Sequence, residues 1–219
     1  MSLKKIIFSI TLTLFVLFVP LLFLGKSHLI LHTKIGYLVV CSFWILMKNP
    51  SLKWAEIKGN AATDKYSSLL IMVVGAITQM MAIVEWSYSK IVCENNLNPI
   101  SMLGILMLFG GLGLRIWAFD TLNFRSFFTG TVTANQNWEL ICTGPYKHIR
   151  HPSYTGAFLT MTGTSVFLET PNSLITSIIL LLIIYYFRIN LEEKLLKSHF
   201  RELYDEYCKK TWTIFPFIW

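Results

Sequence analysis

The stretch ISMLGILMLFGGLGLRIWAF, residues 100–119, decides the fold class of this protein. An α-helix of about 20 apolar residues, rising 1.5 Å per residue, spans the roughly 30 Å hydrocarbon core of a bilayer. Three runs of similar length precede it, at residues 6–24, 29–47 and 67–86. The pattern predicts four membrane helices before residue 120.

Two shorter apolar runs follow, at residues 154–168 and 174–187, and the segment between them contains Pro171. Runs of about 15 residues predict a hairpin of tilted or partly immersed helices that turns at the proline. We therefore expect an all-α, polytopic membrane protein with about six membrane helices. Residues 1–219 form one domain, in which residues 1–99 are scaffold helices and residues 100–219 carry the polar motifs.

The composition agrees with a membrane protein and argues against nucleic-acid binding. Hydrophobic residues make up 54% of the chain and charged residues only 14%, too few to cover a globular surface in water. The net charge of +7 comes from Lys and Arg residues between the apolar runs and not from a basic stripe. With the N-terminus inside, fifteen basic residues lie in inner segments and three in outer loops, which predicts cytoplasmic termini. The four cysteines lack metal-ligand spacing, so no metal site is expected.

The densest polar motif lies between the fourth and fifth apolar runs, in a long mixed segment at residues 120–153. It contains Gly144-Pro145-Tyr146 and Arg150-His151-Pro152-Ser153-Tyr154. The two prolines predict a tight turn and then the first turn of a helix, whose free N–H groups suit a carboxylate or a ribose hydroxyl. The structural alternative is that Arg150 and His151 anchor to headgroups while the tyrosines belong to an aromatic belt.

A second polar cluster, Arg188 followed by Glu192-Glu193, comes directly after the last apolar run. Arg188 and Glu192 are four residues apart, so they could be no more than a helix-stabilising ion pair. Ionisable groups that emerge from a membrane helix are costly, however, and they commonly mark function.

Together the two motifs, with Gly156 after the first, resemble the isoprenylcysteine carboxyl methyltransferase family of integral membrane enzymes. The resemblance implies S-adenosylmethionine-dependent methyl transfer to the carboxylate of a lipophilic, isoprenylcysteine-like acceptor, with S-adenosylhomocysteine as the product. It implies a cofactor pocket on the cytoplasmic side and an acceptor that arrives from the bilayer. The membrane would be the plasma membrane of a bacterium or the endoplasmic reticulum of a eukaryote.

The resemblance also assigns roles by position. The cofactor pocket is expected to be lined by Leu140, Ile141, Tyr146, His151, Pro152, Ser153, Tyr154 and Glu192. Arg188 is expected to contact the acceptor, because a guanidinium can hold a carboxylate bidentately and orient one oxygen toward the methyl group. Glu193 is the other catalytic candidate.

Helix–helix packing gives one more expectation. The glycines of the fourth run are expected to permit close helix contacts around such a pocket; they are Gly104, Gly110, Gly111 and Gly113.

Three alternatives remain open on the sequence. A phospholipid or amine N-methyltransferase would need a base such as Glu193, His148 or His151 to deprotonate its acceptor. A relative of the membrane sterol reductases would bind NADPH and tends toward an Arg-Asp pair in place of Glu192-Glu193. A membrane scaffold with a degenerate site is the non-enzymatic reading.

Overall fold

The computed structural model describes residues 3–26, 29, 32, 34, 35, 38, 65–89, 98–122 and 140–216. Within these ranges every regular element is a helix and there is no β-strand, so the all-α class is confirmed. The elements, in order, are α1 (Leu3–Phe23), α3 (Lys65–Tyr88), α4 (Pro99–Thr121), the 3₁₀-helix η5 (Gly144–Lys147), α5 (Pro152–Phe167), α6 (Pro171–Phe200) and α7 (Glu202–Lys210).

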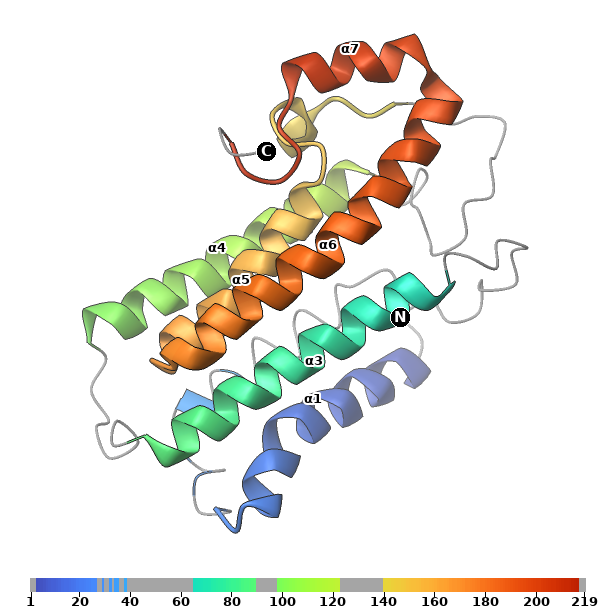
Figure 1. The fold of residues 1–219 in the computed structure, drawn as a ribbon. Helices are drawn as coiled ribbons and strands as arrows, with labels where there is room; N and C mark the ends of the chain where they lie inside the picture. The colour runs from blue at the N-terminus through green and yellow to red at the C-terminus, as the bar shows by residue number, and fades with distance from the viewer. Residues whose placement is uncertain are drawn as a thin grey trace.

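Among the described residues, three helices are long and apolar enough to cross a membrane, at Leu70–Tyr88, Pro99–Thr121 and Pro171–Phe200. The apolar part of α1, Ile10–Phe23, is shorter. These helices and α5 lie side by side in one bundle, and α7 crosses its upper end (Figure 1). The predicted helix at residues 29–47 falls mostly outside the described residues, as does most of the segment at residues 120–153. The chain is a helical membrane protein.

The last long helix extends well beyond its apolar run. The sequence predicted residues 174–187, whereas α6 begins at Pro171 and continues to Phe200, a length of 30 residues. The charges that end the apolar run do not end the helix, because Arg188 and Glu192 pair along its surface with a distance of 2.8 Å between Nε and Oε1. The helix therefore continues past this pair toward α7 (Figure 1).

Helices α4 and α5 make the most extensive contact in the bundle, and glycines allow it. A Cβ atom added at Gly104 would overlap the backbone of Phe167, and one at Gly111 would lie 2.6 Å from the carbonyl oxygen of Gly156. The expectation is confirmed for these two glycines. It is wrong for Gly110 and Gly113, where an added Cβ would meet no atom of the described residues within 4 Å, because those positions face away from α5.

The end of the bundle at the α5–α6 turn is fixed by buried polar contacts. Glu169, with φ of 57°, accepts hydrogen bonds from Ser101 Oγ at 2.8 Å and Asn98 Nδ2 at 2.9 Å, and its Oε1 lies 3.3 Å from Lys34 Nζ. Glu85 of α3 accepts from the backbone N–H of Ser173 at 2.6 Å in the first turn of α6. These contacts join four segments of the chain and set where α6 begins.

Candidate active site

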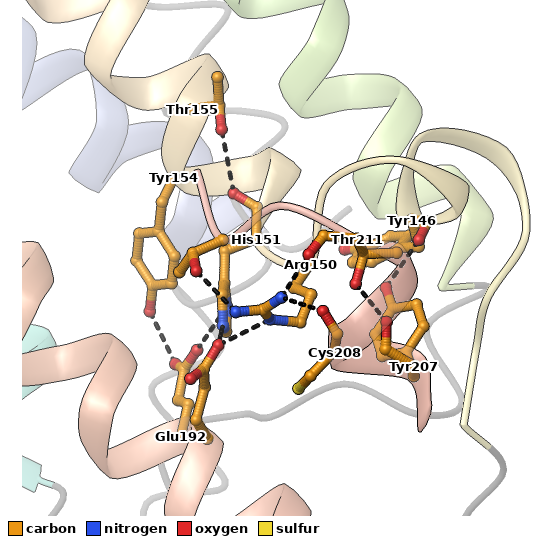
Figure 2. A network of polar contacts seen from close by, with 11 residues as sticks. Tyr146, Arg150, His151, Tyr154, Thr155, Glu192, Tyr207, Cys208 and Thr211 are labelled. Carbon is orange, nitrogen blue, oxygen red and sulfur yellow. Dashed lines mark hydrogen bonds and ion pairs between the residues drawn. The ribbon is translucent and has the colours of Figure 1, made fainter. Parts of the chain in front are cut away.

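A cluster of charged and aromatic side chains lies where η5, the start of α5, the last turns of α6 and the segment after α7 meet (Figure 2). Gly144 opens η5 with φ of 57°, and a Cβ there would lie 2.7 Å from Thr121 Oγ1, so only glycine lets η5 pack on the end of α4. Pro152 is the first residue of α5 and His151 caps it without a side-chain hydrogen bond. The two prolines thus place the motif as the sequence predicted.

Glu192 is the centre of the first half of the cluster. Its Oε1 accepts hydrogen bonds from the Tyr154 hydroxyl at 2.7 Å and from Arg188 Nε at 2.8 Å. Arg188 Nε also lies 3.2 Å from the Tyr154 oxygen, so the three side chains form a closed triangle. Arg188 is only 4% exposed, and a guanidinium so buried needs an anionic partner. The Arg188–Glu192 pair is therefore more than a surface helix pair, because Tyr154 of another helix joins it.

Arg150 organises the second half of the cluster. Its Nε donates to Glu193 Oε1 at 2.9 Å, its Nη1 to the carbonyl oxygen of Thr211 at 2.6 Å, and its Nη2 to Thr213 Oγ1 at 2.6 Å. A guanidinium whose nitrogens are hydrogen-bonded to protein groups on all sides has a structural role. Arg150 thus ties α6 to the C-terminal segment, which is not the role of a headgroup anchor.

His151 lies between the two glutamates. Its Nδ1 is 3.5 Å from Glu192 Oε2 and its Nε2 is 3.4 Å from Glu193 Oε1. Burial alone would lower the pKa of His151, but the two carboxylates outweigh burial and raise the pKa above its usual value. The imidazolium form is accordingly favoured, which leaves His151 poorly suited to act as a base.

The C-terminal segment closes the cluster from above. Backbone bonds run from Arg150 N–H to the Trp212 oxygen at 2.7 Å and from His151 N–H to the Thr213 oxygen at 3.0 Å, and Thr155 Oγ1 donates to the Ile214 oxygen at 2.7 Å. Thr211 and Thr213 could not be predicted as partners of the motif, because a short pairing between distant segments leaves no periodic pattern in the sequence.

The remaining predicted residues lie around this cluster. Tyr146 is buried in η5, and its carbonyl oxygen accepts from the Tyr207 hydroxyl at 2.7 Å. Burial raises the pKa of both phenols, so both stay protonated. The carbonyl oxygen of Ser153 accepts from Arg115. Leu140 and Ile141 lie in the non-helical stretch just before η5 and are partly buried.

Arg115 is the residue that sequence reasoning passed over. It lies in α4, and its Nη1 donates to the Ser153 oxygen at 3.1 Å, next to Tyr154 in the chain. The signal was present, since Arg115 is the one basic residue inside the apolar run at residues 100–119.

The chemistry of the cluster suits a polar, charged organic ligand. Four buried polar atoms in or beside it have no hydrogen-bond partner in the described part of the chain: His151 Nε2, Arg115 Nε and the hydroxyls of Tyr185 and Tyr204. The Tyr185 ring lies 5.1 Å from the ring of Tyr154. Among the same residues no group of three or more His, Cys, Asp or Glu side chains could hold a metal ion. Unsatisfied buried donors of this kind fit a ligand with carboxylate or hydroxyl groups.

Much of this sequence is similar to that of known proteins. Residues 100–203 match the family model described as phospholipid methyltransferase. The chain is 32% identical over 156 residues to protein-S-isoprenylcysteine O-methyltransferase B of Arabidopsis thaliana, covering 69% of this chain and 78% of the relative. It is 29% identical over 161 residues to the Saccharomyces cerevisiae protein-S-isoprenylcysteine O-methyltransferase, covering 74% of this chain and 64% of that one.

A solved structure shares the fold. It is described as the eukaryotic intramembrane Ras methyltransferase ICMT (isoprenylcysteine carboxyl methyltransferase), solved without a monobody. The TM-score is 0.58 at 20% identity, and the match covers 97% of this chain and 74% of that one. The likeness therefore extends over nearly all of this chain.

Proposed function

This chain belongs to the family of the protein-S-isoprenylcysteine O-methyltransferases, and from that premise we propose that it methylates the carboxylate of a lipophilic, isoprenylcysteine-like acceptor with S-adenosylmethionine as the donor. The observation that carries the proposal is the triangle that Tyr154 and Glu192 form around the buried Arg188, which the fold assembles from two helices. A scaffold protein has no need for so costly a cluster at the membrane boundary. Membership of a methyltransferase family also argues against the alternative of an NADPH-binding relative of the sterol reductases.

The donor supplies a methyl group on a positively charged sulfur, and the acceptor carboxylate forms the new carbon–oxygen bond as the carbon–sulfur bond breaks. The acceptor is already ionised at neutral pH, so this chain need not remove a proton. Its contribution is placement, and well-oriented reactants can gain on the order of 7–11 kcal/mol from effective molarity. This is why the cluster can be rich in ion pairs and poor in bases.

We assign the roles within the cluster accordingly. Glu192 would hold a hydroxyl or the amino group of the cofactor, while Tyr146, the segment from His151 to Tyr154, Leu140 and Ile141 line the pocket. Arg188 would meet the acceptor carboxylate, because a guanidinium can hold a carboxylate through two parallel hydrogen bonds. Glu193 positions Arg150 and His151 through the contacts described above.

A phospholipid or amine acceptor is the second candidate, and the match of residues 100–203 to the phospholipid methyltransferase model favours it. An amine must lose a proton before or during transfer, so a base is required. Glu193 and His151 are engaged with each other and Glu193 also with Arg150, which makes both weak candidates. His148 is exposed beside η5.

Competition between acceptors tests the assignment. The purified protein in detergent micelles is given S-adenosylmethionine with S-farnesyl-N-acetylcysteine, its amide, or phosphatidylethanolamine. We expect methylation of the free acid alone, and Arg188→Ala should abolish it while the exposed substitution Lys194→Ala leaves it intact. Methylation of the phospholipid in preference to the acid would establish the second candidate instead.

The orientation in the membrane is also part of the proposal. We expect both termini and the cluster on the cytoplasmic side, because in this orientation the inner segments hold fifteen basic residues and the outer loops three. Cys142 is exposed beside η5 and offers a label. In a variant with the other three cysteines replaced by serine, a membrane-impermeant maleimide should label inverted vesicles and spare intact cells. The reverse pattern would refute the orientation.

A further inference from the structure

Arg115 is a cation at the end of the α4–α5 contact where α5 begins. Its backbone packs directly on α5, because a Cβ added at Gly156 would lie 2.8 Å from the backbone nitrogen of Arg115 and 3.0 Å from its Cβ. From there Nη1 of the side chain donates to the carbonyl oxygen of Ser153 at 3.1 Å, one residue before Tyr154. The guanidinium therefore lies on the α4 side of the cluster, across α5's first turn from the triangle of Tyr154, Arg188 and Glu192.

The other cations of the cluster each have a carboxylate. Arg188 pairs with Glu192, Arg150 pairs with Glu193, and His151 contacts both glutamates. The two negative charges are thus shared among three cationic groups before Arg115 is counted. Any further cation leaves an excess of positive charge in a buried place.

The partners of Arg115 are neutral. Besides the Ser153 carbonyl it has the face of the Phe119 ring, 4.9 Å from its Cζ, and its Nε is buried with no hydrogen-bond partner in the described part of the chain. No Asp or Glu of that part forms an ion pair with it. Arg115 as a residue is only partly buried, but its Nε is fully buried. A buried guanidinium nitrogen without an anionic partner is costly, and a neutral side chain could make the single contact with the Ser153 carbonyl. The arrangement suits a site whose counter-ion arrives with a ligand.

We propose that Arg115 is a second ligand-binding guanidinium of the site, which binds a carboxylate carried by one of the two reactants. The inference rests on the proposed function, in which two carboxylates are present: that of the acceptor and that of the methionine part of the cofactor. Both have the chemistry that a guanidinium recognises. Arg115 and Arg188 would then each bind one carboxylate.

The test pairs two variants of Arg115 with ligands that lack one carboxylate. Arg115→Gln keeps a donor for the Ser153 carbonyl and removes the charge, and Arg115→Lys keeps the charge. The full chain in detergent is titrated with S-adenosylhomocysteine and with its decarboxylated analogue, and the KM for S-farnesyl-N-acetylcysteine is measured. Lys194→Gln serves as the control for loss of an exposed positive charge.

We expect Arg115→Gln to weaken one carboxylate ligand by about tenfold or more, as loss of a charge-assisted hydrogen bond does, and Arg115→Lys to restore part of the loss. If the cofactor carboxylate is bound, the variant loses affinity for S-adenosylhomocysteine but not for the decarboxylated analogue. If the acceptor carboxylate is bound, the KM for the acceptor rises while the affinity for S-adenosylhomocysteine stays unchanged.

Equal losses of affinity for S-adenosylhomocysteine and its decarboxylated analogue, without a rise in the KM for the acceptor, would assign Arg115 a structural role and overturn the inference. So would affinities and KM within twofold of wild type. A wild-type protein that binds neither S-adenosylhomocysteine nor acceptor would contradict the proposed function itself, a result distinct from an active wild type with an unaffected Arg115→Gln variant.

Discussion

Replacement of Glu192 by Gln is the perturbation that most sharply separates a buried charge cluster from an ordinary helix pair. Gln keeps the shape of the side chain and an oxygen that can accept from Tyr154 at the observed 2.7 Å. It removes the negative charge beside Arg188, whose side chain is 4% exposed. The change therefore isolates the charge.

The magnitude follows from that burial. Breaking a buried ion pair by removal of one partner costs about 3–5 kcal/mol, because the remaining charge has no counter-ion. Gln retains one hydrogen bond, so we expect the lower end, about 3 kcal/mol in the free energy of unfolding. An exposed pair at the same i, i+4 spacing would cost only about 0.3–0.5 kcal/mol.

The assay is a double-mutant cycle with Arg188→Met, read by chemical unfolding in one detergent. The double variant should be less destabilised than the sum of the two single variants, with a coupling free energy of about 1–3 kcal/mol. Glu206→Gln on α7, an exposed position, is the matched control and should change the stability by less than about 0.5 kcal/mol. Additive effects, or a Glu192→Gln variant as stable as the control, would refute the reasoning.

The remaining predictions concern packing, titration and a single hydroxyl. Gly104→Ala should destabilise the protein by about 1–3 kcal/mol, since its Cβ would overlap α5, whereas Gly110→Ala has open space and should leave thermal stability unchanged or slightly higher. The wild type should have a higher free energy of unfolding than a His151→Gln variant below about pH 6.5, the pKa of an unfolded histidine, and this difference should be lost as pH rises through the raised pKa of the folded state. A difference in stability that instead grows with pH would contradict a charged imidazole. Tyr154→Phe should lower the affinity for S-adenosylhomocysteine by about tenfold or more through disorder of Glu192 and Arg188, with the fold retained by circular dichroism; unchanged affinity would remove Tyr154 from the site.

Apolar run length was enough to predict α3 and α4, because a helix that crosses a bilayer must be of about that length. The same rule failed at the end of α6. The rule ends the predicted helix before Arg188, because Arg188 and Glu192 are charged. In the structure the two charges neutralise each other, and the helix continues to Phe200. Hydropathy contains no information on pairing.

The glycines and the C-terminal segment show a second kind of limit. All four glycines of α4 look alike in sequence, yet only Gly104 and Gly111 face α5. That face is set by the rotation of the helix in the bundle, which the sequence of α4 alone does not determine. Likewise Thr213 meets Arg150 only because the chain after α7 folds back over η5.

The site motifs themselves were predictable in part. The prolines and the Arg188–Glu192 spacing indicated local structure, and the resemblance brought the two motifs together. The partner of each charge was not predictable, since Arg150 pairs with Glu193 across 43 positions in the chain while Glu192 takes Arg188 and Tyr154. Arg115 was visible as a lone cation in an apolar run, but its place beside Ser153 depends on the α4–α5 contact.

The most direct test of the central claim is methyl transfer by the wild-type protein from S-adenosylmethionine carrying a deuterated methyl group. The purified chain is incubated with S-farnesyl-N-acetylcysteine and the products are analysed by mass spectrometry before and after mild base. The account predicts a deuterated methyl ester that base hydrolyses back to the free acid. No labelled ester from a folded protein, or a label that resists base on an amine acceptor, would contradict it.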